Sequence, residues 1–216
     1  MYQWIWRCKH ANKRADKKYK RVYELLKHGK ERRKSGNRKD SRGVIHNRVP
    51  IEQRPDIVDK RLRAGDIEIN FMMGKNHKGA LIVMTDRSTL HTSIQKISNR
   101  YSGIVSKAII KKLKQVNYSL HTLTFDNDLG FASHMEVARA LNVNTYFTRP
   151  YTSQDKGTVE NRIGQIRRFF PKKTDLSTVT DKQVKQVEKL LNNRPVRKFN
   201  YLTPNQVLQQ KIALIT

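Results

Sequence analysis

The chain has 216 residues, with 45 Lys and Arg, 18 Asp and Glu and a formal net charge of +27, which suits one domain with a core and an appendage. So large a positive surplus repels itself unless a polyanion lies nearby, which makes nucleic acid the natural partner. A ribosomal-type or otherwise simply basic protein is the alternative class. The single cysteine, Cys8, excludes an intramolecular disulfide, and no apolar run is long enough to cross a bilayer, so we expect a soluble intracellular protein.

The positive charge is densest near the N-terminus. Residues 1–65 carry 21 Lys and Arg against 7 Asp and Glu, a surplus of 14, whereas the remaining 151 residues have a surplus of 13. Between Lys9 and Arg48 apolar clusters are almost absent, so this stretch buries too little surface to fold alone. We predict a basic arm or linker over residues 1–54 that lies on DNA, with a solvated tail as the alternative, and a folded domain over residues 55–216.

Beyond residue 55, strand and helix patterns follow one another along the chain. Period-two alternation or short apolar runs predict strands over residues 67–71, 80–85, 90–97, 121–125 and 143–147. Apolar residues at helical spacing predict helices over residues 57–65, 104–113, 135–141, 157–170, 181–191 and 204–214. Three consecutive strands predict an antiparallel half, and the later strand-helix-strand order predicts a parallel half. This order is typical of an α/β, ribonuclease H-like fold, a mixed five-stranded sheet flanked by helices and preceded by the basic arm.

Three positions in this fold are candidates for metal-dependent phosphoryl transfer, which needs oxygen ligands converging from different elements. Asp126 follows the fourth strand, where α/β proteins place ligands, although local sequence alone favours an Asx turn in which Asp126 caps the next helix. Glu160, separated from Asp126 by thirty-three residues, lies in the first turns of a helix, where a carboxylate also compensates the helix dipole. On the first strand Glu68 and Asn70 share a face, and a metal site would need an aspartate at one of them.

Several stretches carry a family resemblance. They read Phe125-Asp-Asn127, then Tyr146-Phe-Thr-Arg-Pro-Tyr-Thr-Ser-Gln-Asp-Lys-Gly-Thr-Val-Glu-Asn161, then Asn192-Asn-Arg-Pro195 and Leu202-Thr-Pro204. Together they resemble the DDE transposases of the IS-thirty insertion-sequence family, whose catalytic domain is retroviral-integrase-like. The match runs in order from about Gly65 to the C-terminus, and its Pro-Tyr…Lys-Gly-x-x-Glu-Asn segment is long and specific.

The resemblance implies a bacterial, cytoplasmic, nucleoid-associated enzyme that cleaves the ends of an insertion sequence and joins them to target DNA. It implies Mg²⁺ or Mn²⁺ at a two-metal site, double-stranded DNA of the element ends and the target as partner, a homo-oligomer, and no small-molecule cofactor. Asp126 and Glu160 match the second and third metal-binding carboxylates. The family motif Gly-Asp-x-Glu-x-Asp reads Gly65-Asp-Ile-Glu-Ile-Asn70 here, so Asn70 stands where the first catalytic aspartate is expected.

This departure predicts an incomplete metal site and impaired activity, because an amide offers one neutral oxygen and no negative charge. We do not expect Glu68 to substitute, because it lies about 6–7 Å away along the strand. The family's helix-turn-helix region, which precedes the catalytic domain, is expected to be missing. DNA contacts are predicted at Lys156, Asn161, Arg162 and Arg167, with a solvated helix face as the alternative. A non-catalytic DNA-binding remnant of a transposase is the alternative function.

Overall fold

The computed structural model describes residues 2–10, 19, 22, 44–149 and 157–213. The chain divides into two compact units, Met1–Ser41 and Arg42–Thr216. In the described part of the first unit, helix α1 (Tyr2–Lys9) buries Ile5 and Cys8. The folded unit begins before the predicted boundary at residue 55, because the chain from Val49 onward contacts the sheet. Phe147 N donates to Val49 O over 2.8 Å, and Pro50 forms a parallel bridge to Phe147.

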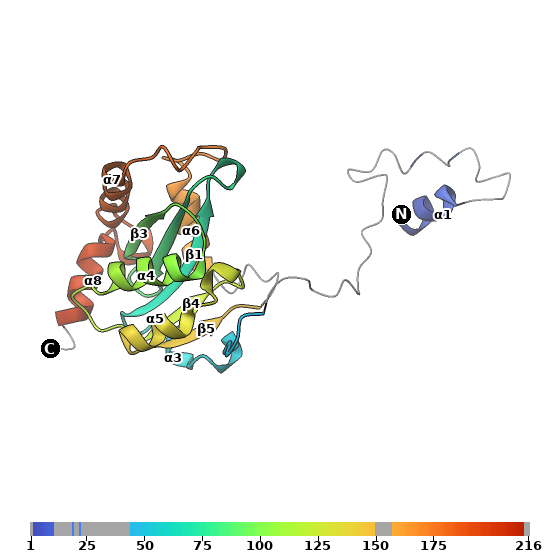
Figure 1. Ribbon diagram of the computed structural model, residues 1–216. Helices are drawn as coiled ribbons and strands as arrows, with labels where there is room; N and C mark the ends of the chain where they lie inside the picture. Colours follow the sequence, from blue (N-terminus) through green and yellow to red (C-terminus); the bar gives the residue numbers. More distant parts are fainter. Residues whose placement is uncertain (1, 11–18, 20–21, 23–43, 150–156, 214–216) are drawn as a thin grey trace. The chain divides into compact units, whose positions relative to one another are not determined.

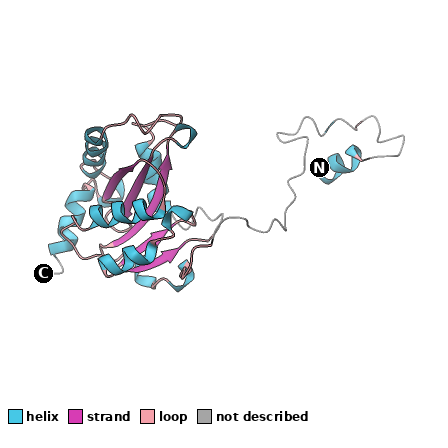
Figure 2. Cartoon of the chain, in the orientation of Figure 1, coloured by secondary structure: helices cyan, strands magenta, loops and turns pink. Residues whose placement is uncertain are grey.

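The second unit is built on a five-stranded sheet of order β3-β2-β1-β4-β5. Its strands are β1 (Asp66–Met73), β2 (Ala80–Asp86), β3 (Thr92–Ile97), β4 (Thr122–Phe125) and β5 (Asn144–Phe147). The first three pair antiparallel, while β1 with β4 and β4 with β5 pair parallel (Figure 2). The predicted mixed sheet is confirmed, and β1 lies at its centre, where the antiparallel and parallel halves meet.

Helices cover both faces of this sheet. Helices α4 (Ser102–Leu113) and α5 (His134–Leu141) lie across the face turned toward the viewer in Figure 1. Helices α6 (Gly157–Ile166) and α7 (Asp181–Asn192) share a second core with residues of the opposite face. Helix α8 (Pro204–Ala213) contacts α7. Among the described residues, no helix combines the length and apolar character that a membrane crossing requires.

The two cores follow from the alternation of side chains along β1. Ile67 and Ile69 belong to the core beneath α4 and α5, whereas Met72 belongs to the core beneath α6 and α7. Because successive side chains of a strand point to opposite faces, Glu68 and Asn70 share the α6 side with Met72. The face on which β1 carries its polar residues is therefore the face that α6 covers.

Three predicted element boundaries shift for local reasons. The helix predicted over residues 57–65 is the single turn α3 (Asp56–Asp59), because Arg61 adopts a φ of 56° that is incompatible with an α-helix. The strand predicted from residue 90 begins at Thr92, because Leu90 has a φ of 62°. The helix predicted over residues 157–170 ends at Ile166, and beyond it Arg168 N donates to Gln165 O, three residues back, in a tighter turn.

Candidate active site

The register of β1 and β4 brings two of the predicted site residues side by side. Glu68 pairs with Thr124 and Ile69 pairs with Phe125 in the parallel ladder, so Asn70 and Asp126 are the next positions on the two strands. Neighbouring strands lie about 4.8 Å apart, and residues level with each other point to the same face. Asn70 and Asp126 are both half-buried, and each accepts a hydrogen bond from the amide that follows it, Asn70 Oδ1 over 2.8 Å and Asp126 Oδ1 over 2.7 Å.

The third predicted residue, Glu160, is carried by the first turns of α6. Helix α6 contacts both β1 and β2, and Val159 N donates to Glu68 Oε2 over 2.9 Å. This bond joins the start of α6 to the face of β1 that bears Asn70, two residues further along. Glu160 follows Val159 directly and is exposed. The structure therefore brings the middle of β1, the end of β4 and the start of α6 to one region of the sheet.

Glu68 itself is fully committed to internal contacts. Its side chain is completely buried, and while Oε2 accepts from Val159, Oε1 forms an ion pair with Arg87. Arg87, just after β2, also donates from Nε to Val58 O over 3.1 Å. Both oxygens of the Glu68 carboxylate thus already have partners in the interior, which supports the expectation that Glu68 does not take the place of an aspartate at residue 70.

The same network continues to β4. Arg87 Nη2 lies 3.3 Å from Asp59 Oδ1, and Asp59 also pairs with Arg54. Arg54 Nη1 in turn donates to Thr124 Oγ1 over 2.9 Å, two residues before Asp126. Residues of α3 and the segment before it thus cross-link β1 and β4 beside the candidate site. The sequence carried one signal of this network, because an inward-facing Glu68 on a central strand requires a cationic partner.

Of the predicted DNA-contacting residues, Arg162 is buried in the protein. It is 2% exposed, and Nη2 donates to Leu90 O over 2.8 Å while Nη1 donates to Gln165 Oε1 over 2.9 Å. Burial, and after it the charge of Arg194, lowers the pKa of Arg162 to about 10. This corrects the prediction at Arg162, because a buried guanidinium bonded within the protein is not available to a phosphate.

The other three positions differ from one another. Asn161 is exposed, and its Oδ1 accepts from Gln165 Nε2 over 3.0 Å. Arg167 is half-buried and donates from Nη2 to Met73 O over 2.7 Å, and burial lowers its pKa. Lys156 lies outside the described residues. DNA contacts at Asn161, Arg167 and Lys156 stay predictions.

The described residues contain no cluster of three or more His, Cys, Asp or Glu side chains arranged to hold a metal ion. With Asn70 in place of an aspartate, the predicted site offers two carboxylates, Asp126 and Glu160, and one amide oxygen. All three are hard oxygen donors of the kind that Mg²⁺ and Mn²⁺ accept, with one negative charge fewer than three carboxylates would supply. These three oxygen donors are of the type that a divalent cation accepts, but together they carry one negative charge fewer than three carboxylates would.

Comparison with known proteins places the chain among transposases. No family model matches it. The transposase for insertion sequence element IS4351 of Bacteroides fragilis is 42% identical over 212 residues, which cover 98% of this chain and 63% of that protein. Transposase InsI for IS30A of Escherichia coli K12 is 33% identical over 193 residues, which cover 88% and 49%. The chain thus spans less than two thirds of the length of these curated relatives.

The fold has a counterpart among solved structures. The catalytic core domain of BIV integrase superimposes with a TM-score of 0.53, covering 68% of this chain and 94% of that domain. At 16% identity this likeness shows the fold alone, and it agrees with the mixed sheet order described above. By sequence and by fold, the chain is a homologue of the IS30-family insertion-sequence transposases over part of their length, with the fold of a retroviral integrase catalytic core.

Proposed function

We propose that the chain is the catalytic portion of a DDE transposase, which cleaves the ends of an insertion sequence and joins them to target DNA with the help of divalent metal. The observation that carries this proposal is the parallel register, which sets Asn70 beside Asp126 on the face where Glu68 anchors the start of α6. Double-stranded DNA is the proposed partner, a homo-oligomer the proposed state, and the bacterial cytoplasm, on the nucleoid, the proposed location.

The proposed metal ligands are Asp126 and Glu160, with Asn70 as a weak third donor. Divalent ions at such a site supply Lewis-acid stabilisation of the charge that develops on the phosphoryl oxygens. Asn70 lacks the negative charge with which an aspartate would hold them, and its amide nitrogen cannot ligate a cation. We therefore propose that the chemistry of this chain is impaired at residue 70, while its fold and DNA binding are intact.

The substitution Asn70→Asp tests this proposal. It restores the third carboxylate, so we expect clearly tighter Mn²⁺ binding, measured by titration followed by electron paramagnetic resonance. We also expect strand joining of pre-cut element ends to rise about 100-fold or more, the scale on which a charge-stabilising group acts at a reacting centre. The joining assay uses labelled oligonucleotides that carry the element's own terminal repeats.

Two control variants make the result specific. Asn76→Asp adds the same charge on the exposed turn between β1 and β2, and it should change neither readout. Adding Glu160→Gln to Asn70→Asp should abolish the gain, because it removes the carboxylate from α6. If Asn70→Asp binds DNA normally yet gains neither manganese nor joining activity, the site assignment is wrong.

A second candidate function is a DNA-binding remnant without catalysis, which Asn70 and the net charge of +27 favour. This alternative predicts steeply salt-dependent binding with little sequence preference, because phosphate contacts dominate the affinity. It also predicts no effect of Asn70→Asp on metal binding, so the same titration separates the two candidates.

A further inference from the structure

A cavity of about 300 Å³ next to the start of α6 is lined by an unusual number of arginines. Its described lining consists of four arginines, two acids and two other residues: Arg54, Arg61, Arg87, Arg149, Glu52, Asp59, Ile51 and Gly157. We call it the arginine cavity. Arg54 and Arg87 are each only 6% exposed and belong to the network that links β1 to β4. Arg61 and Arg149 are more accessible and form its outer part.

The acids of the arginine cavity do not balance its cations. Asp59 is shared between Arg54 and Arg87, and Glu52 lies 3.4 Å from Arg149. Arg61 forms no ion pair with any other residue that the structure describes. With Glu68, which pairs with Arg87 from behind the cavity, four guanidinium groups share three carboxylates, all of which are already paired. A cavity with this charge surplus is complementary to an anion.

Neighbouring elements add to the positive charge and hold Arg61 in place. Burial, followed by the charges of Arg61, Lys211 and Arg87, lowers the pKa of Lys198, which lies in the short helix η6 (Arg197–Phe199). Lys211 of α8 donates to Leu62 O over 2.8 Å, directly beside Arg61. Arg61 has the left-handed φ of 56°, an uncommon conformation for a residue other than glycine. The fold thus holds Arg61 at the cavity although neighbouring cations repel it and although its backbone conformation is an unfavourable one.

We propose that the arginine cavity binds a phosphate group of the DNA strand that approaches the candidate active site. Guanidinium groups bind phosphate oxygens through pairs of parallel hydrogen bonds, and two of these arginines are fixed in advance by buried partners. The cavity shares Arg54 and Arg87 with the network that holds β1 and β4, so a phosphate seated there would be positioned relative to Asp126. The identity of the phosphate as DNA rests on the proposed function; the anion site itself does not.

The test removes the two outer arginines. In the full chain, Arg61→Gln and Arg149→Gln are combined, and duplex DNA binding is measured over a range of salt concentrations by fluorescence anisotropy. Each lost phosphate contact should make the negative slope of log affinity against log salt shallower by about 0.9. Arg139→Gln is the matched control, because Arg139 is an exposed arginine of α5 that lines a separate cavity. A slope for the double variant equal to that of Arg139→Gln overturns the proposal.

Inorganic phosphate distinguishes a DNA phosphate from a free anion. If the cavity is a phosphate site for DNA, the double variant has the shallower slope of log affinity against log salt. Inorganic phosphate then also raises the melting temperature of the unmodified chain more than that of the double variant. A phosphate effect with an unchanged salt slope would assign the cavity to a small free anion and overturn the DNA assignment. Arg149→Gln alone, at a largely exposed side chain, repeats the test should the double variant fold poorly. Neither readout needs metal or strand joining, so both stay interpretable if the proposed catalysis fails.

Discussion

At the scale of single residues, the amide of Asn70 separates this chain from a complete three-carboxylate site. Its Oδ1 accepts a hydrogen bond from the following backbone amide, as Asp126 Oδ1 does on the neighbouring strand. The two side chains thus adopt the same local arrangement and differ in charge. Because the backbone at residue 70 is the same for an amide and a carboxylate, Asn70→Asp should restore charge without disturbing the fold.

The burial of Arg162 replaces its predicted role in DNA contact with a role in stability, which a substitution can test. Arg162→Ala removes a fully buried side chain and one of the two donors to Leu90 O, the other being the Thr92 hydroxyl. We expect the free energy of unfolding to fall by roughly 2–4 kcal/mol, mainly from the cavity and partly from the lost hydrogen bond, measured by urea denaturation.

The matched control for Arg162→Ala is Arg168→Ala, at an exposed arginine just beyond the end of α6. Exposed substitutions of this kind change stability by about 0.5 kcal/mol or less. DNA affinity of the folded Arg162→Ala protein should stay close to that of the unmodified chain. A variant that is fully stable yet binds DNA weakly would show that Arg162 reaches the DNA after all.

At the scale of elements, the position of α6 depends on a contact with β1. Glu68 receives the amide of Val159 on one oxygen and Arg87 on the other, so one buried carboxylate connects β1, the start of α6 and the residue after β2. The rest of α6 is held by its apolar face, through Val159 and Ile166 in the second core. Apolar contacts are not directional, so the hydrogen bond to Glu68 fixes where the helix begins.

Glu68→Gln tests this anchoring. It removes the buried carboxylate partner of Arg87 and leaves that guanidinium only the partly exposed Asp59, which should lower the free energy of unfolding by up to roughly 3–5 kcal/mol in urea denaturation. Hydrogen exchange at the Val159 and Glu160 amides should accelerate beyond the change expected from global stability alone. In the Asn70→Asp background, Mn²⁺ binding should weaken because Glu160 is less well positioned.

Asp66→Asn is the matched control for Glu68→Gln. Asp66 is also buried on β1, on the same face, but it bonds to Arg63 and Thr122 rather than to α6. Its substitution should reduce stability without selectively exposing the amides of α6. Equal exchange at Val159 in both variants would show that Glu68 has only a general structural role.

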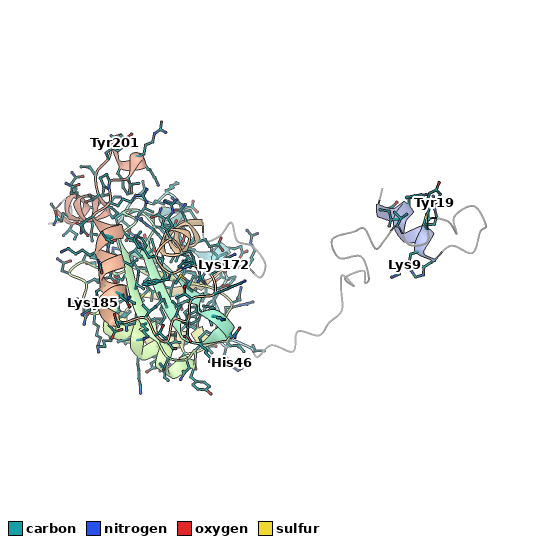
Figure 3. All side chains as sticks on the ribbon, turned by 90° about the horizontal axis from the view of Figure 1, so that it is seen from above. Lys9, Tyr19, His46, Lys172, Lys185 and Tyr201 are labelled. Atoms are coloured by element: carbon teal, nitrogen blue, oxygen red, sulfur yellow. The ribbon has the colours of Figure 1, made fainter. Side chains whose placement is uncertain are left out.

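At the scale of the whole molecule, charge and folding are distributed unequally between the two units. Residues 1–41 carry 15 Lys and Arg against 4 Asp and Glu, a surplus of 11 out of the net charge of +27. Both buried cores of the sheet belong to the second unit, Arg42–Thr216. Lys185 on α7 and the exposed Tyr201 both point outward from this unit (Figure 3).

A fragment comprising residues 42–216 should therefore keep the stability of the full chain and lose part of its DNA affinity. We expect a melting temperature within a few degrees of that of the full chain, because the cores are retained. The slope of log affinity against log salt should be shallower, since the basic first unit is gone. An unchanged slope in the fragment would show that residues 1–41 do not lie on DNA.

The sequence by itself determined the order of the elements and the candidates for the site. Period-two and helical apolar spacing are local properties, and they predicted the five strands and the main helices with boundary shifts at positions such as Arg61 and Leu90. The pair Asp126 and Glu160, with Asn70 as the departure, also came from local motifs. Their chemistry needed only residue type and a position at the end of a strand or the start of a helix.

Only the tertiary structure decided which charged residues are structural. Glu68 meets Val159 across a sequence separation of 91 residues, and Arg54 meets Thr124 across 70. No local pattern specifies such partners, because they are chosen by strand register and by the packing of α6 on the sheet. The same packing buries Arg162, which shares the inner face of α6 with Val159 and Ile166. Residue type thus predicted the chemistry available to the chain, and burial determined which residues are free to use it.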